Sequence, residues 1–176
     1  DVVITVDYGH GLLTPKIINQ IENKSRYLAL NTQMNSFNIG HHTISKYSDV
    51  NYVCVHEGEL RNDYRDHNNN IENLTKSLSK RINAEVIVIT QGNEGSLVYD
   101  NNDFINCPAF ANKVVDRIGA GDTLLAITSL CFAVGMPKDL TLLIGNLAAA
   151  EMVASIGTGM KLSKINILKS IEALFK

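Results

Sequence analysis

Short β-branched runs alternate with amphipathic helical segments over residues 1–90, and this alternation restricts the possible folds more than any other feature of the sequence. Apolar runs predict strands at 1–6, 27–30, 52–55 and 86–89. Between them, Thr14-Pro15 opens a predicted helix, and an apolar stripe predicts another over 71–82. Parallel neighbours need a crossover connection, usually a helix, and the covering helices bury both faces of the sheet. The sequence therefore predicts an α/β fold, a three-layer α/β/α domain with a mainly parallel central sheet.

The second half of the chain follows a different pattern. Strands at 96–99 and 104–107 flank Asp100-Asn101-Asn102-Asp103, a strong hairpin signal, and are expected to be antiparallel. From Gly119 onward the sequence predicts helices at roughly 120–134, 138–155 and 163–175, with breaks at Gly135-Met136-Pro137 and Gly157-Thr158-Gly159. One domain over 1–176 accounts for this length. Because the chain opens directly on a strand, without a solvated lead-in, we expect a C-terminal fragment of a larger protein.

Composition argues against several classes of function. Lys plus Arg number 16 against 18 Asp plus Glu, and a net charge of -2 gives no broad attraction to nucleic acid or to an anionic membrane. A small-molecule partner is expected instead. Cys54, Cys107 and Cys131 are odd in number and form no CxxC pair, which disfavours a disulfide framework and a zinc site and favours the cytoplasm. No apolar run reaches the ~18 residues that a membrane span requires.

The segment Gly119-Ala120-Gly121-Asp122 carries the clearest chemical signal. It stands where a loop becomes an apolar helix, so the first amide groups of that helix have no internal partners and attract an anion. Asp122 lies in the same first turn, where its carboxylate can accept the proton of an attacking hydroxyl. Alone, a G-x-G-D segment is more often only a turn with a helix cap.

The surrounding residues favour the catalytic interpretation. Residues 116–123, D-R-I-G-A-G-D-T, resemble the signature D-T-x-G-A-G-D of the ribokinase (PfkB) family of sugar kinases, with Arg117 in place of the usual Thr. The resemblance implies a ribokinase-like fold in which Asp122 is the general base and Gly119, Ala120 and Gly121 form the anion hole. It spans essentially the whole chain but only the C-terminal portion of the family, so the N-terminal part and the lid have no counterpart here.

Two further segments resemble nucleotide and metal motifs of this family. Thr90-Gln91-Gly92-Asn93-Glu94-Gly95 resembles T-x-G-x-x-G, which implies nucleotide contacts by Thr90, Gly92 and Gly95. His56-Glu57-Gly58-Glu59 resembles N-x-x-E, with His56 in place of Asn, and implies that Glu59 helps to place Mg²⁺. Nucleotide is expected at the C-terminal edge of the sheet, between the Thr90–Gly95 turn and the helix start at Gly119.

The resemblance also reaches the start of the chain. Asp7-Tyr8-Gly9-His10-Gly11 resembles the D-Y-G-K-G of the heptose-phosphate kinase branch, with His10 in place of Lys. It implies substrate contacts by Asp7, Gly9, His10 and Gly11. Asn31-Thr32-Gln33 stands where many relatives carry Asp-Pro-Lys, so an acid and a base are replaced by amides.

Two weaker candidates remain open. Asn146 lies on a small-residue helix in the region where relatives cover the adenine, which implies a cofactor contact, although close helix packing through Gly145 and Ala148 explains the pattern equally well. His41, His42 and His67 fit loop positions better than metal sites and are assigned no role.

The motifs together favour an ATP-dependent carbohydrate kinase that uses Mg²⁺ and acts on a hydroxyl of a sugar or sugar phosphate; a homodimer is compatible with the resemblance. The alternative is a non-catalytic nucleotide-binding or regulatory module, which the substitutions at Arg117, His56 and Gln33 favour. A dinucleotide oxidoreductase is disfavoured, because no G-x-G-x-x-G follows the first strand.

Overall fold

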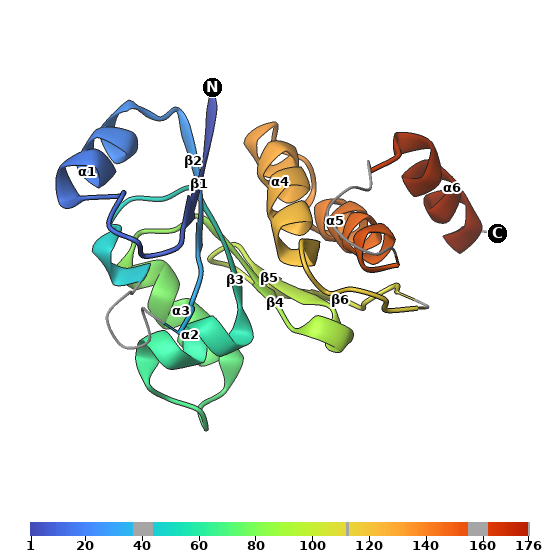
Figure 1. The fold of residues 1–176 in the computed structure, drawn as a ribbon, viewed down its shortest axis with the longest axis horizontal. Coiled ribbons are helices and arrows are strands. Elements are labelled where there is room, and N and C mark those ends of the chain that lie inside the picture. The colour runs from blue at the N-terminus through green and yellow to red at the C-terminus, as the bar shows by residue number, and fades with distance from the viewer. Residues whose placement is uncertain (37–43, 112, 155–161, 176) are drawn as a thin grey trace. The chain divides into compact units, whose positions relative to one another are not determined.

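The computed structural model describes residues 1–36, 44–111, 113–154 and 162–175 (Figure 1). His41, His42 and the predicted helix break at Gly157-Thr158-Gly159 lie outside these residues. The chain forms two compact units, one of residues 1–91 and 97–105 and the other of residues 92–96 and 106–176. Whether they make a single domain stays a prediction.

A six-stranded sheet has its strands in sequence order. The strands are β1 (Val2–Asp7), β2 (Tyr27–Thr32), β3 (Tyr52–His56), β4 (Val86–Thr90), β5 (Ser96–Tyr99) and β6 (Phe104–Cys107). Strands β1 to β4 pair in parallel, and Asp7 lies opposite Thr32 and His56 opposite Thr90. The four carboxyl ends therefore meet at one edge of the sheet. Four residues join β5 to β6, which is enough for an antiparallel hairpin and too few for a parallel crossover. The predicted α/β fold with a mainly parallel sheet is confirmed.

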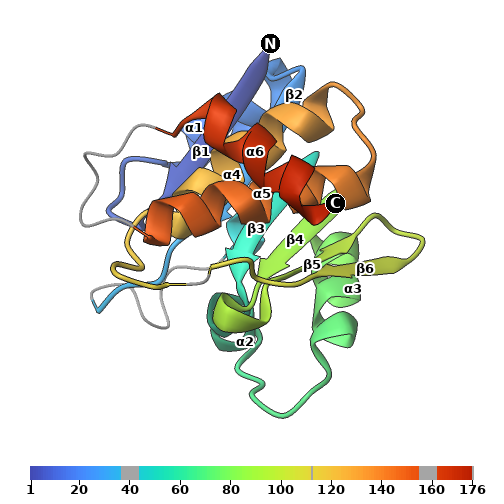
Figure 2. The same ribbon diagram turned by 90° about the vertical axis from the view of Figure 1, so that its right-hand side faces the viewer.

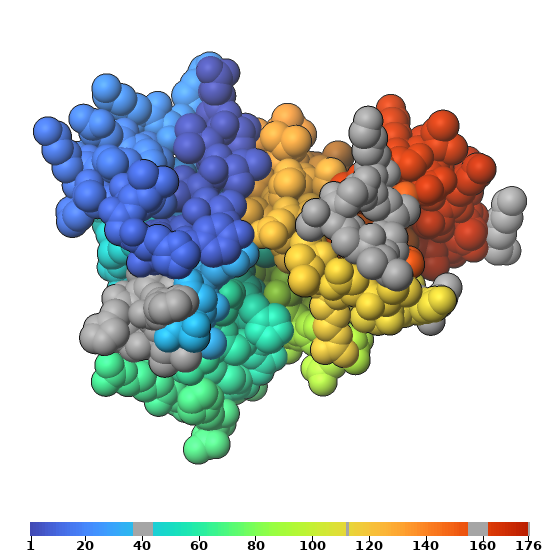
Figure 3. Space-filling view, viewed as in Figure 1, coloured from blue at the N-terminus to red at the C-terminus, as the bar shows by residue number. Residues whose placement is uncertain are grey.

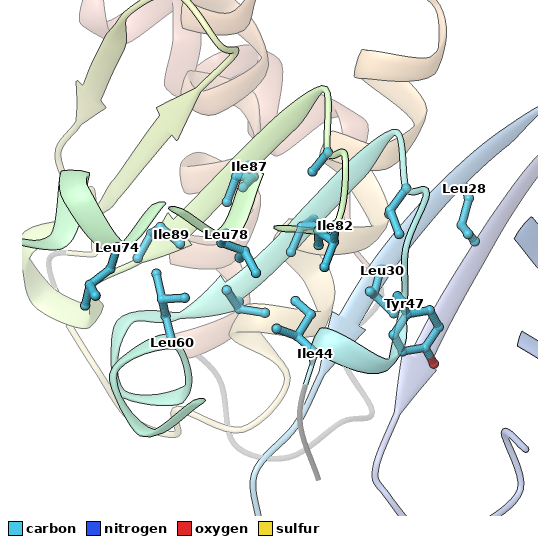
Figure 4. Packing of buried hydrophobic residues seen from close by; sticks show 14 of the residues in the cluster. Leu28, Leu30, Ile44, Tyr47, Leu60, Leu74, Leu78, Ile82, Ile87 and Ile89 are labelled. Atoms are coloured by element: carbon cyan, nitrogen blue, oxygen red, sulfur yellow. The ribbon is translucent and has the colours of Figure 1, made fainter. Parts of the chain in front are cut away.

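The helices of the first unit cover one face of this sheet. They are α1 (Pro15–Lys24), α2 (Glu57–Tyr64) and α3 (Ile71–Arg81), with a short 3₁₀ turn, η1, at Ile44–Lys46. One apolar cluster joins strand residues to helix residues (Figure 4), including Leu28, Leu30, Val53, Val55, Ile87 and Ile89 from the strands and Ile18, Leu60, Leu74, Leu78 and Ile82 from the helical side. Sequential parallel strands with right-handed crossovers place their helices on a common face, as observed.

Local capping explains where these helices begin. Thr14 is the N-cap of α1 and accepts from the amide of Ile17, and Pro15 follows where its missing amide costs nothing. Asn70 caps α3 in the same way. Helix α2 was not predicted, because Leu60 is its only buried residue and no apolar stripe marks it. A capping box formed by His56 and Glu59 sets its start instead.

The second unit contains three α-helices among its described residues. They are α4 (Ala120–Ala133), α5 (Lys138–Val153) and α6 (Lys164–Leu174), close to the predicted ranges, and a 3₁₀ turn, η2, spans Gly92–Glu94. Helices α4 and α5 pack side by side (Figures 1 and 2). A Cβ added at Gly145 would stand 2.6 Å from the Thr128 methyl carbon, so the absence of a side chain permits this approach. Within the described ranges, no helix combines the length and apolar character needed to cross a bilayer.

Gly145→Ala should therefore destabilise the protein, although the same change inside a helix ordinarily stabilises by about 0.5–1 kcal/mol. Overpacking against Thr128 should lower the free energy of unfolding by about 1–2 kcal/mol in chemical denaturation. Thr128→Ser deletes the opposing methyl group but keeps the hydroxyl that donates to the Leu124 carbonyl at 2.6 Å. Adding it should restore most of the loss, and an unchanged or stabilised single variant would contradict the packing argument.

Candidate active site

The N-terminus of α4 is open among the described residues. Gly119 is its N-cap with φ at 83°, and no side chain caps this helix end. That backbone conformation is strained for residues with a side chain, which accounts for glycine at this position. Asp122 lies in the first turn and is exposed. Because Gly119 occupies the N-cap position, Asp122 is not the N-cap of this helix.

The turn before this helix is held by its own side chains. Asp116 accepts from the amide of Ile118 at 3.0 Å, and the amides of Val115 and Asp116 donate to the carbonyl of Val153 at 2.8 and 3.2 Å. A Cβ at Gly121 would meet no atom within 4 Å. The segment is therefore fixed from behind and unobstructed at Gly121.

The loop after β4 is shaped by Gly95. This residue has φ at 100°, and a Cβ there would stand 2.1 Å from the carbonyl oxygen of Cys107. Only glycine fits, since two backbone segments approach at this point. Gly92 has φ at 60° and its carbonyl accepts from the amide of Gly95 at 3.2 Å. Thr90 ends β4 in the first unit, and Gly92 and Gly95 belong to the second.

Asn146 is buried in α5 with its amide engaged. Its Nδ2 donates to Ser96 Oγ at 2.6 Å and to the carbonyl of Leu142 at 2.9 Å, and the residue is 6% exposed. Close packing of α4 on α5 at Gly145 is also observed. The structure thus gives Asn146 protein partners on two sides.

Asp7 is a buried carboxylate at the end of β1. Its Oδ2 accepts from Tyr47 Oη at 2.7 Å and pairs with Lys46 Nζ at 2.5 Å, while Oδ1 accepts from the amide of Gly9 at 2.9 Å. Burial acts to raise the pKa of Asp7, but the hydrogen bonds from Lys46, Tyr47 and Gly9 outweigh it and lower that pKa below its usual value. Burial and the bond to Asp7 raise the pKa of the Tyr47 hydroxyl, which stays protonated.

Sequence reasoning missed these two partners of Asp7. Lys46 and Tyr47 follow Asp7 by some forty residues, and no spacing signal connects them. Tyr47 lies at the edge of the apolar cluster nearest β1, with its hydroxyl turned away from the apolar side chains (Figure 4).

The turn after β1 reaches the molecular surface (Figure 3). Gly9 and Gly11 have φ at 71° and 83°, and the rings of Tyr8 and His10 lie 6.3 Å apart. Tyr8 and His10 are exposed, in contrast to Asp7. The turn therefore presents His10, and Asp7 holds its base through the Gly9 amide.

Glu59 lies in the first turn of α2. Its Oε2 accepts from the amide of His56 at 2.8 Å, and its Oε1 accepts from the amide of Met34 at 3.3 Å. The residues after β2 also join the β1 turn, since the amide of Gln33 donates to the Asp7 carbonyl at 3.0 Å. A surface hollow beside Glu59 is lined by Thr32, Gln33, Met34, Ile44, Val55, Leu60, Asn62, Asp63 and Arg65. Over the part of the chain that the structure describes, no three His, Cys, Asp or Glu side chains cluster as a ready metal site.

Asp7→Asn should lower the free energy of unfolding by about 2 kcal/mol near neutral pH, because a charged acceptor is lost from a buried site. A carboxyl with a depressed pKa stabilises the fold above its unfolded value of ~3.9, and this contribution disappears as pH falls through the folded value. The stability gap between wild type and variant should therefore close in acid below about pH 4.

Denaturant melts over a pH series measure this gap. Tyr47→Phe keeps the ring and should cost about 1 kcal/mol, and the exposed Asp49→Asn serves as the control with little effect at any pH. A gap for Asp7→Asn that does not change with pH would show that its charge contributes nothing to stability.

Comparisons with known proteins agree with the motifs. The family model described as pfkB family carbohydrate kinase matches residues 16–165. The bifunctional protein HldE of Campylobacter fetus subsp. fetus is 30% identical over 187 residues and covers 100% of this chain, which spans 38% of that protein. HldE of Syntrophotalea carbinolica is 32% identical over 100 residues, which cover 56% of this chain and 20% of that protein. The chain therefore spans well under half the length of these curated relatives.

Solved structures show the same fold at low identity. Phosphofructokinase-2 from Escherichia coli in complex with potassium has a TM-score of 0.82 at 14% identity, over 99% of this chain and 57% of that chain. Arabidopsis thaliana ribokinase complexed with ribose and ATP has a TM-score of 0.76 at 17% identity, over 96% of this chain and 55% of that chain. The family and the heptose-phosphate kinase branch predicted from the motifs are both confirmed. The chain belongs to the pfkB family of carbohydrate kinases and has the ribokinase-like α/β fold.

Proposed function

We propose that the protein containing this chain transfers the γ-phosphoryl group of ATP to a hydroxyl of a sugar or sugar phosphate, with Asp122 as the general base. One observation carries the proposal: the α4 N-terminus has no side-chain cap and presents an exposed carboxylate in its first turn. Family membership supplies the reaction class, and this helix end supplies the two groups that the reaction needs.

The chemistry follows from the position of these groups. Backbone amides at a helix N-terminus stabilise negative charge, so Gly119, Ala120 and Gly121 would form an anion hole for the transferring phosphoryl group. A carboxylate accepts the proton of the attacking hydroxyl as the new bond forms. An exposed Asp122 is accessible to such a hydroxyl, as a buried one would not be.

ATP contacts are assigned to the loop after β4 and to α5. Thr90, Gly92 and Gly95 would approach the nucleotide through their backbone, since glycine lets a ligand come close to the main chain. Asn146 belongs to the same site in this proposal, and its buried position bears on how it acts.

Mg²⁺ is assigned to Glu59 together with the phosphates of ATP. Mg²⁺ usually keeps several waters and takes one or two carboxylates plus substrate phosphates, so a dense protein cluster is not required. Each Glu59 oxygen accepts one backbone amide and retains a further lone pair, which fits a contact made through water. The metal would neutralise charge on the phosphates.

The sugar or sugar phosphate is assigned to the turn after β1. Gly9, His10 and Gly11 would contact it, and His10 is the exposed side chain of the turn. Asp7 would act on the substrate through this turn, because its carboxylate already bonds Lys46, Tyr47 and Gly9. A homodimer and a cytoplasmic location stay predictions from the sequence.

Nucleotide binding without phosphoryl transfer is the second candidate. Arg117, His56 and Gln33 depart from the family motifs, and both oxygens of Glu59 already accept backbone amides. This alternative keeps the fold and the nucleotide contacts but predicts no turnover with any sugar.

Asp122→Asn in the product of the complete open reading frame separates the two candidates. The amide keeps the shape of the side chain but cannot accept the proton, so turnover should fall by roughly 100-fold or more with little change in ATP affinity. Coupled assays over a panel of sugars and sugar phosphates measure turnover, and calorimetry on the same protein measures ATP binding.

Asp139→Asn is the matched control, since Asp139 is also an exposed acidic residue in the first turn of an apolar helix. It should leave turnover unchanged. Near-normal turnover of Asp122→Asn would refute the catalytic assignment. Wild-type protein that binds ATP but phosphorylates no acceptor would favour the second candidate.

A further inference from the structure

A buried polar cluster in the second unit lies next to the loop assigned to ATP. Asn146 is 6% exposed, Ser96 is 1% exposed and Cys107 is 8% exposed. Burying an amide or a hydroxyl without a hydrogen bond costs free energy, so such groups persist where they are paired and their geometry matters.

Asn146 makes bonds that fix its own orientation. Its Nδ2 donates to Ser96 Oγ at 2.6 Å and to the Leu142 carbonyl one helical turn earlier at 2.9 Å. The amide also forms a side-chain hydrogen bond with Cys107; burial raises the pKa of that thiol and this bond partly opposes the rise. Both hydrogens of the amide therefore have acceptors within the protein.

Ser96 and Cys107 stand on the two sides of Gly95. Ser96 follows it directly in the chain, and the Cys107 carbonyl lies where a Gly95 side chain would begin, 2.1 Å from an added Cβ. Asn146 thus reaches from α5 to both segments that confine the last glycine of the loop. Helix packing alone would not need an amide here, since an apolar side chain of similar size would fill the same space.

We infer that Asn146 is a positioning residue, which fixes the Gly92–Gly95 loop through the Ser96 hydroxyl and the end of β6 rather than by direct contact with the nucleotide. The inference rests on the proposed function in one respect, that this loop lies against ATP. It adds Ser96, and through it a specific hydrogen bond, to the residues on which ATP affinity depends.

The test compares two variants that remove the same bond from opposite ends. Asn146→Leu and Ser96→Ala should each weaken ATP binding by about tenfold, which corresponds to one hydrogen bond, and the double variant should be no weaker than either alone. A direct contact between Asn146 and the nucleotide predicts instead that Ser96→Ala binds ATP normally. Calorimetry with ATP and the protein from the complete open reading frame gives these affinities.

A second measurement does not depend on ATP. Hydrogen exchange of the backbone amides of residues 92–95 should accelerate in both variants without nucleotide, while Asn166→Leu leaves it unchanged. Asn166 is the control because it is an exposed asparagine of the same unit, and its Nδ2 donates to Glu151 at 2.8 Å.

The outcomes separate this inference from the proposed function. Loop exchange that is unchanged in Asn146→Leu, or additive losses of ATP affinity, would overturn the positioning role. Wild-type protein that binds no ATP, with loop exchange still accelerated in both variants, would refute the proposed function and leave the positioning role intact.

Discussion

Parallel pairing of β1 to β4 is the constraint on which the first unit depends. Parallel strands end at the same edge, and the register sets Asp7 opposite Thr32 and His56 opposite Thr90. The turn after β1, the segment after β2 and the start of α2 are therefore neighbours, although the sequence separates them. Backbone amides bond across these segments, from Gln33 to Asp7 and from Met34 to Glu59. This edge is where open α/β sheets bind ligands, so the polar residues that collect there have a physical reason to be functional.

A buried charge at this edge requires compensation, and Asp7 shows how it is met. Its carboxylate combines an ion pair with Lys46, a hydroxyl bond from Tyr47 and a backbone amide from Gly9. Removing one partner from such a group costs far more than the intact arrangement gains over an apolar one. The benefit is therefore in geometry: one carboxylate joins β1 to the residues after η1 and fixes the base of the exposed turn. A group used in this way is poorly suited to bind a substrate that must also leave.

The sequence predicted what depends on periodicity and backbone chemistry. Strand and helix alternation gave the parallel sheet, and Thr14-Pro15 marked the start of α1. Helix α2 could not be predicted, because Leu60 alone is buried and the reciprocal bonds of His56 and Glu59 begin the helix. The partners of Asp7 were also beyond prediction, since they come from a segment some forty residues away. Motif resemblance identified Gly95 as a loop residue, but only the approach of the Cys107 carbonyl explains why no side chain fits there.

Exposure separates two kinds of polar residue within the second unit. A proton acceptor has to meet its substrate, and Asp122 stands exposed at a helix end with no side-chain cap. A residue that holds a loop in place gains from burial, because a hydrogen bond is stronger where water cannot compete for its groups. Asn146 meets this condition, with its amide bonded to Ser96 and to the Leu142 carbonyl. Both residues lie in motifs of one family, yet their surroundings assign them different tasks: chemistry to the exposed carboxylate, and loop geometry to the buried amide.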